Sequence, residues 1–252
     1  MPAEVLTYAV RRSARARRAR LTVTAEGRVV VVLPQRAPLG TAALLVHEHA
    51  DWVQRQLIRA RAQQARLDAR PDLAAGRVLS VNGIPHDVVV HPAAGRGRRG
   101  SVRRQLLSDA DGIRGELLVT SGGSAPDAAM TEEERASRLL EGWLRAEARR
   151  VLAARVTAMA PQVGVTPGRL SIRAQRSRWG SASRDGSLSF NWRLLLAPAF
   201  VLDAVVVHEL AHLRVRGHSA AFWALARAHA PRTDEARRWL REHHRELLAA
   251  LE

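Results

Sequence analysis

The residue types best suited to chemistry lie in the stretch Val207–His212, where two histidines flank a glutamate at fixed spacing. On a helix, His208 and His212 lie four residues apart, so both imidazoles project from one face and can hold one ion. Glu209 lies about 100° further around the helix. From there it can reach a water on the metal without being a ligand. The pattern predicts a catalytic zinc site with Glu209 as the general base.

A third ligand is expected from His218, six residues after His212. Zinc held by three protein ligands keeps a fourth position for water, which is the arrangement of catalytic sites. His218 can reach the ion only if the helix stops and the chain folds back. Gly217 favours this, because a glycine at the C′ position takes the left-handed conformation at little cost. Ser219 can then cap the next helix.

Other ligands remain open as alternatives. Glu235 and Glu242 lie on a predicted later helix, and a downstream helical glutamate is the third ligand in another large group of zincins. We favour His218, because a ligand close in sequence to a helix-breaking glycine is the more specific signal. The remaining small histidine clusters are interpreted as surface residues: His47, His49, His243 and His244.

Composition limits the metal chemistry. The chain of 252 residues has no cysteine, which excludes disulfides and thiolate zinc sites. We therefore expect one zinc ion, held by histidine, aspartate or glutamate side chains. The N-terminal residues do not resemble a signal peptide, and the longest apolar runs are too short to span a bilayer. We expect a cytoplasmic protein without membrane contacts.

The net charge of +16 usually indicates an anionic partner such as nucleic acid. All 40 basic residues are arginine, however, and alanine is abundant, which is also what the coding bias of a GC-rich genome produces. We treat nucleic-acid contact as an alternative to solvated loops. The charge gathers in two groups, the first being Arg11, Arg12, Arg15, Arg17, Arg18 and Arg20 and the second Arg96, Arg98, Arg99, Arg103 and Arg104.

The first half of the chain is predicted to be rich in strands. Alternating and continuous apolar runs predict strands within residues 5–34 and 73–120, the latter with a turn at Asn82-Gly83. Between them, apolar residues at helical spacing predict one long amphipathic helix over about 39–69.

Two polar stretches are predicted to be a loop and a linker, and the linker lies near the predicted domain boundary. The Arg/Gly-rich residues 95–104 are expected to form an exposed hairpin loop, and residues 121–126 a linker. The chain is thus predicted to consist of a β-rich N-terminal region, 1–128, and a metallopeptidase module, 129–252.

The predicted module begins with a helix. Thr131 and Glu134 form a capping box, and Pro161 is expected to stop this helix. Pro198 fits the first turn of the metal helix. The other expected elements are strands at 170–173 and 188–193, a turn at Asp185-Gly186, and helices at about 219–229 and 233–251.

Several motifs around the histidines carry a family resemblance. They are Ser177-Arg178-Trp179-Gly180-Ser181-Ala182-Ser183, Asn191-Trp192-Arg193, Ala197-Pro198, His208 to His212, and His218-Ser219 to Phe222-Trp223. With these motifs the chain resembles the YgjP-like family of predicted metal-dependent hydrolases, which are similar to the SprT-like metalloproteases. The resemblance covers nearly the whole chain, loosely in its N-terminal part.

The resemblance implies a zincin fold with zinc on His208, His212 and His218 and with Glu209 as the catalytic base. One position departs from the family pattern: Ala182 stands where the family usually has cysteine. That argues against a thiol role at this position and leaves the zinc site unaffected.

A strand beside the metal helix borders the cleft in zincins and pairs with extended substrate. Residues 188–193 are our candidate for that strand, by β-augmentation. Arg178 and Asn191 are candidates to stabilise an oxyanion, and Trp179 to contact substrate. The alternative is that Trp179 and Trp192 are core aromatics and that Arg178 is a structural ion-pair partner.

The sequence thus predicts an α+β protein: a zincin-like metallopeptidase module, whose active-site helices pack on a small antiparallel sheet, preceded by a strand-rich part with one long helix. The predicted function is zinc-dependent hydrolysis of a protein or peptide substrate, with Glu209 assisting the attack of water. One alternative is a DNA-associated SprT-like protease that acts on nucleic-acid-bound proteins. The other is a non-catalytic binding module stabilised by zinc, against which the intact Glu209 argues.

Overall fold

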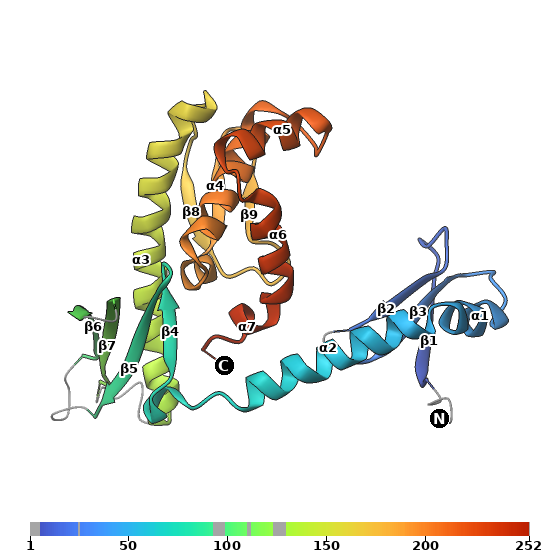
Figure 1. The fold of residues 1–252 in the computed structure, drawn as a ribbon, viewed down its shortest axis with the longest axis horizontal. Helices are drawn as coiled ribbons and strands as arrows, with labels where there is room; N and C mark the ends of the chain where they lie inside the picture. The colour runs from blue at the N-terminus through green and yellow to red at the C-terminus, as the bar shows by residue number, and fades with distance from the viewer. Residues whose placement is uncertain (1–5, 25, 93–98, 110–111, 123–129, 252) are drawn as a thin grey trace. The chain divides into compact units, whose positions relative to one another are not determined.

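The computed structural model describes residues 6–24, 26–92, 99–109, 112–122 and 130–251, and its helices and small sheets confirm the mixed α+β class. It consists of two compact units, residues 1–70 and 71–252, and each is described by itself (Figure 1). Within the described residues, no helix combines the length and apolar character needed to cross a membrane.

Unit 1 contains a three-stranded sheet in the region predicted to form strands. Its strands are β1 (Tyr8–Ser13), β2 (Arg20–Val23) and β3 (Val29–Pro34), in the order β1-β3-β2. The central strand β3 is parallel to β1 and antiparallel to β2. A small core forms where β3 meets the first helix; its buried members are Val31, Leu33, Ala42 and Val46.

The helix predicted over 39–69 is two helices, α1 (Gly40–Glu48) and α2 (Ala50–Asp68). They are separated at His49, whose φ of −113° and ψ of 21° are not helical. The apolar spacing continues across this residue, so a periodicity argument does not detect the break.

Unit 2 begins with the short helix η1 (Leu73–Ala75) and a four-stranded sheet. Its order is β4-β5-β7-β6, and its strands are β4 (Val78–Val81), β5 (Ile84–His91), β6 (Ser101–Asp109) and β7 (Gly112–Thr120). β5 and β7 are parallel, and the other pairs are antiparallel. The predicted turn is confirmed, since Asn82 and Gly83 have φ of 54° and 83°, as a two-residue hairpin requires.

The predicted loop at 95–104 and linker at 121–126 need correction. Residues 101–104 belong to β6, and 93–98 lie outside the described residues. At the linker, Ser121 is 3% exposed and its hydroxyl donates to the His91 carbonyl oxygen, while 123–126 lie outside the described residues.

The unit boundary lies between Arg70 and Pro71, and not near residue 128 as predicted. The reason is that the four-stranded sheet shares one core with the C-terminal helices: Leu79 and Leu117 are buried in the same cluster as Leu140. A hydrogen bond of 2.7 Å from the Asn82 amide to the Leu195 carbonyl adds to this packing.

Helix α3 (Glu132–Val163) runs from this sheet to the second sheet of unit 2 (Figure 1). The predicted capping box is present: the Thr131 amide donates to Glu134 at 2.7 Å, and the Glu134 amide donates to the Thr131 hydroxyl at 3.2 Å. The helix does not stop at Pro161 but continues to Val163, and Gly164 ends it with φ of 74°. A proline disturbs the turn before it and not the one after it, and the amides of Gly164 and Val165 close the last turn by donating to the carbonyls of Pro161 and Ala160, both at 3.1 Å.

The second sheet consists of β8 (Leu170–Arg173), β9 (Gly180–Ala182) and β10 (Leu188–Asn191), in the order β8-β10-β9. It is mixed and not antiparallel as predicted, because β10 is parallel to β8 and antiparallel to β9. The predicted turn between β9 and β10 is present, with Gly186 at φ of 83°.

The short helix η3 (Trp192–Leu196) leads into the C-terminal helices. These are α4 (Ala199–Arg214), α5 (Ala220–His229), α6 (Thr233–Glu242) and α7 (His244–Leu248). The helix predicted over 233–251 is therefore interrupted at His243. Helix α4 packs against α5 and α6 of this group and also against α3 and β9, so it is enclosed on most sides.

Candidate metal centre and cleft

Helix α4 carries the first two histidines and is buried over most of its surface. Its run Val205–Val207 favours a strand locally, yet it is helical, because packing of the apolar residues outweighs the modest cost of β-branched side chains in a helix. The helix ends at Arg214, two residues earlier than a glycine at C′ would require. Gly217 does take the predicted left-handed conformation, with φ of 74°, and lies in the turn that follows.

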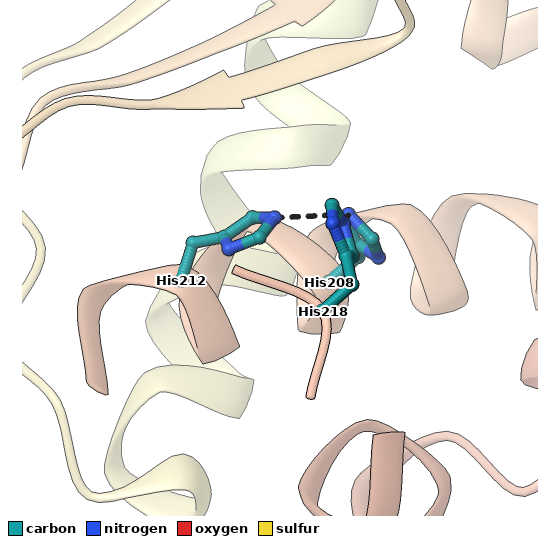
Figure 2. A group of neighbouring side chains, drawn as sticks. All are labelled: His208, His212 and His218. Carbon is teal, nitrogen blue, oxygen red and sulfur yellow. Dashed lines mark hydrogen bonds between the residues drawn. The ribbon is translucent and has the colours of Figure 1, made fainter. Parts of the chain in front are cut away.

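That turn returns His218 to the helix. Ser219 caps α5, since its hydroxyl accepts a hydrogen bond of 3.3 Å from the Phe222 amide. The Nε2 atom of His208 then lies 3.1 Å from the Nε2 atoms of both His212 and His218 (Figure 2). Tetrahedral zinc–nitrogen bonds place pairs of ligand atoms about 3.3 Å apart. The three histidines therefore fit one ion.

The rival carboxylates are not part of this group. Among the described residues, the histidines form the one set of three potential ligands within 4.8 Å of one another. Glu235 forms an ion pair with Arg232 at 2.5 Å. The residue that joins His208 and His212 in this group is thus His218, the histidine that follows the glycine.

Aromatic side chains from α5 fix the imidazoles. Phe222 stacks on His212 with ring centroids 4.5 Å apart, and Trp223 stacks on His218 at 5.4 Å. His212 also forms a hydrogen bond with the Val215 backbone. Such contacts orient ligand rings before an ion arrives. Neither aromatic residue is predicted from the sequence to have this role, although both lie within the first turn after the Ser219 cap.

Burial keeps two of the imidazoles neutral. It lowers the pKa of His208 to about 4, with a further contribution from His212, His218 and Arg237 when charged. It also lowers the pKa of His212. A neutral imidazole has the free lone pair that a metal ion needs.

Glu209 lies beside the histidines but is not among the clustered ligands. It is 5% exposed, and burial raises its pKa to about 7, against the opposing charge of Arg178. Strand β9 lies directly on it: a Cβ atom at Gly180 would be 2.5 Å from Glu209 Oε1. Glycine is therefore required for this close approach.

A cleft of about 470 Å³ opens over the histidines and Glu209. One wall is β9 with its flanking residues, and the other is α4 with the turn that contains Gly217. Three imidazole nitrogens, a buried carboxylate and an adjoining cleft are together suited to metal-assisted hydrolysis.

A family model for the YgjP-like metallopeptidase domain matches residues 17–243. The chain belongs to the YgjP-like family. The match includes most of unit 1 as well as nearly all of unit 2. No curated protein and no solved structure matches the chain. At the level of the family, this YgjP-like protein is a metal-dependent peptidase.

The cleft strand of this YgjP-like chain is β9, and not residues 188–193 as predicted. β10 is the central strand and is paired on both sides, so its backbone is not available to a substrate. β9 is at the sheet edge and lines the cleft. It was missed because three residues, Gly180–Ala182, are too few to show strand periodicity.

The other predicted substrate contacts lie in different places. Arg178 lines the cleft. Trp179 does not; it packs on the core and meets the His244 ring edge-on at 5.4 Å. Asn191 is 2% exposed, and its amide donates to the Gln175 carbonyl at 2.6 Å, so it holds the chain beside β10 and not the substrate.

The alternative interpretation, in which the tryptophans are core aromatics, fits Trp192. Trp192 is fully buried in the core, as a packing aromatic would be. His243 and His244, predicted at the surface, are half-buried, because Trp239 stacks on the first and Trp179 contacts the second. His47 and His49 are exposed as predicted.

The first arginine group lies on and between β1 and β2 of unit 1, and its members are exposed. Arg12 has a structural task, since its guanidinium donates to the carbonyls of Gln35 at 2.5 Å and Ala37 at 3.0 Å. The others form no ion pair with any residue that the structure describes: Arg11, Arg15, Arg17, Arg18 and Arg20.

Proposed function

We propose that this YgjP-like protein is a zinc-dependent peptidase in which His208, His212 and His218 hold the ion and Glu209 is the general base. The observation that carries the proposal is the convergence of three Nε2 atoms beside a buried carboxylate outside the ligand group. When bound, zinc supplies a Lewis acid that activates water and polarises a carbonyl. Imidazoles and this ion are well matched, and no thiolate is needed.

Side chains and backbone of the protein would transfer the proton, bind the substrate and stabilise the developing charge. In this proposal Glu209 takes a proton from the attacking water and returns it to the leaving amine. The free edge of β9 offers main-chain hydrogen bonds to an extended peptide. Arg178, close enough to Glu209 to affect its pKa, is a candidate to stabilise the negative charge that develops on the carbonyl oxygen.

The decisive experiment is Glu209→Gln in the zinc-loaded protein. We expect zinc content by mass spectrometry to remain at the wild-type level. Peptide cleavage should fall by about 10²–10⁴-fold, the usual contribution of a general base. His212→Ala serves as the control, because it should lose zinc and activity together. A Glu209→Gln variant that cleaves at the wild-type rate removes Glu209 from the mechanism.

A second experiment distinguishes the enzyme from a zinc-stabilised binding module. Cobalt can replace zinc and reports ligand changes in its absorption spectrum. For a catalytic site we expect the spectrum to change when a peptide hydroxamate is added, because a position remains open. A spectrum that does not respond, together with no cleavage of any peptide, favours the binding module.

A second candidate function is peptidase action near nucleic acid. Residues 1–70 contain 13 arginines and 5 acidic residues, a net charge of +8, and the arginines around β1 and β2 are exposed. This is the kind of charge that neutralises phosphates. We expect DNA affinity to fall steeply with salt, and the slope to shrink when Arg15, Arg17 and Arg18 become serine. A wild-type slope equivalent to fewer than about two phosphates would sink this candidate.

A further inference from the structure

The cleft over the histidines is strongly basic. Arg178 precedes β9, Arg184 follows it, and Arg216 lies in the turn after α4; all three line the cleft and are exposed. Glu209 is the single carboxylate among the residues that line it. A bound divalent ion adds further positive charge.

The charge on these guanidiniums is little compensated by the described residues; of the three, Arg178 acts on the Glu209 carboxylate. None of Arg178, Arg184 and Arg216 forms an ion pair with a residue that the structure describes. The neighbouring carboxylate of Asp185 is engaged in its own turn, where it accepts hydrogen bonds from Ser183 and Ser187. Unpaired cations around a cleft attract anionic groups and raise their local concentration.

Other arginines of unit 2 behave differently. Arg232 pairs with Glu235 at 2.5 Å, Arg150 with Glu147 at 2.6 Å, and Arg227 with Asp234 at 2.8 Å. The abundance of arginine therefore does not by itself leave guanidiniums unpaired. At the cleft, by contrast, Arg178, Arg184 and Arg216 form no such ion pair with any residue in the described part of the chain.

Arg178, Arg184 and Arg216 lie around the part of the cleft in which an extended peptide would pair with β9. Arg178 and Arg184 stand at the two ends of β9, and six residues of extended chain span at most about 20 Å. A peptide paired with β9 passes both ends, with Arg216 on the opposite wall beside Gly217. Side chains on either side of the scissile bond would meet a guanidinium, which binds carboxylates well.

We propose that the cleft selects peptides with acidic residues on both sides of the scissile bond, with Arg184 and Arg216 as specificity-determining residues. This rests on the proposed peptidase function.

The cleft favours a peptide over a single-stranded nucleic acid. The lining contains arginine, glycine, serine, alanine, histidine and one glutamate, but no phenylalanine, tyrosine or tryptophan on which a base could stack. The histidine rings of the lining are already in contact with Phe222 and Trp223. The adjacent strand edge offers backbone hydrogen bonds that suit an extended peptide. The small side chains of Ser181 and Ala182 leave room beside that edge.

The test uses the zinc-loaded full chain and quenched fluorescent peptides of one sequence, with aspartate, asparagine or lysine on both sides of the cleaved bond. We expect kcat/KM to be about tenfold higher for aspartate than for asparagine, as two partly exposed ion pairs allow, and lowest for lysine. The preference should narrow between about 0.05 and about 0.5 M salt.

Charge reversal identifies the residues responsible. Arg184→Glu and Arg216→Glu should each shift the preference toward the lysine peptide. Arg169→Glu is the matched control, because Arg169 is exposed, outside the cleft lining, and changes the net charge equally. Peptides cleaved without charge preference, or an equal shift in all three variants, would overturn the inference and leave the peptidase function standing.

A binding measurement separates the two proposals. In zinc-loaded Glu209→Gln, fluorescence anisotropy should show tighter binding of the aspartate peptide than of the lysine peptide. If this preference is found while the wild-type protein cleaves no peptide, the peptidase function fails and the cleft selectivity remains. Displacement of the bound aspartate peptide by a single-stranded oligonucleotide at lower concentrations than by polyglutamate would overturn the selectivity for acidic peptides.

Discussion

Units 1 and 2 carry the same net charge of +8, but unit 1 has 70 residues and unit 2 has 182. In unit 2, many arginines form ion pairs within the unit. Arg155 in α3, for example, pairs with Asp203 in α4 at 2.7 Å. In unit 1, the arginines around β1 and β2 remain exposed. Equal net charge therefore has different consequences in the two units. In unit 2 an arginine ion pair joins two helices, and in unit 1 the arginines around β1 and β2 face solvent.

The hydrophobic core of unit 1 is also much smaller than that of unit 2. The core of unit 1 joins one strand to one helix, and large apolar side chains such as Leu44 and Ile58 stay exposed, at 64% and 62%. The core of unit 2 extends from the four-stranded sheet through α3 and α4 to α7. A site that needs side chains held closely in place is therefore expected in unit 2, where neighbours fix the rotamers.

The largest expected effect comes from truncating one fully buried leucine in the core of each unit. Leu152→Ala in α3 and Leu33→Ala in β3 remove fully buried side chains, and each should lower the free energy of unfolding by about 2–5 kcal/mol. Only Leu152→Ala should lower the urea concentration at which zinc is released, because only it lies in the core shared with α4. If both variants lowered the urea concentration of zinc release equally, the two cores would not be independent.

A smaller effect is expected from Gly180→Ala. The added methyl group would lie 2.5–2.8 Å from Glu209 atoms, so β9 or the carboxylate must move. We expect kcat to fall by about 10–100-fold, as a displacement of about 1 Å at a catalytic group can do, with zinc content unchanged.

Gly142→Ala is the matched control for that change. Gly142 lies on α3, and a Cβ atom there has no neighbour within 4 Å. Alanine should leave turnover as it is and stabilise the helix by up to about 1 kcal/mol. Full activity in Gly180→Ala would show that β9 does not constrain Glu209.

The smallest effect concerns pH and a buried histidine of unit 2. His86 is fully buried; its Nδ1 lies 2.8 Å from the Ile84 carbonyl oxygen, and its Nε2 accepts from Arg104 Nε at 2.8 Å. Burial lowers its pKa from 6.5, so the unfolded chain binds the proton more readily. The stability that neutral His86 contributes is thus present above pH 6.5 and is lost as pH falls below it.

The measurement is the free energy of unfolding of the wild-type protein and of His86→Gln at about pH 7.5 and about pH 5. Glutamine has no proton to gain, so the wild-type protein should lose more stability than the variant over this interval. Other titrating groups are common to both proteins and cancel in the comparison. An identical pH dependence would remove His86 as the cause.

Much of the candidate site was predictable because its signals are local. His208 and His212 share a helix face through their spacing, and Gly217 provides the left-handed turn that precedes His218. The capping box at Thr131 is equally local. Such features depend on a few consecutive residues, whose conformation is set by sterics and nearby hydrogen bonds.

The cleft wall was not predictable in the same way. β9 has three residues, and its position at the sheet edge depends on pairing with β10 and on contact with α4. Asn191 appeared suited to the cleft by its type, but the fold directs its amide to the Gln175 carbonyl. Such assignments depend on residues that are distant in sequence, so local spacing carries no information about them.

The grouping of the three histidines, the place of the glutamate between the first two, and the turn before the third all follow from local spacing. Three features follow only from the packing of distant segments: the core that the four-stranded sheet shares with α4, the contact of β9 with Glu209, and the arginines without an ion pair among the described residues. The physical reason is that helix spacing and turns are fixed by neighbours along the chain. Edge positions, burial and ion pairing are fixed by which distant surfaces pack together.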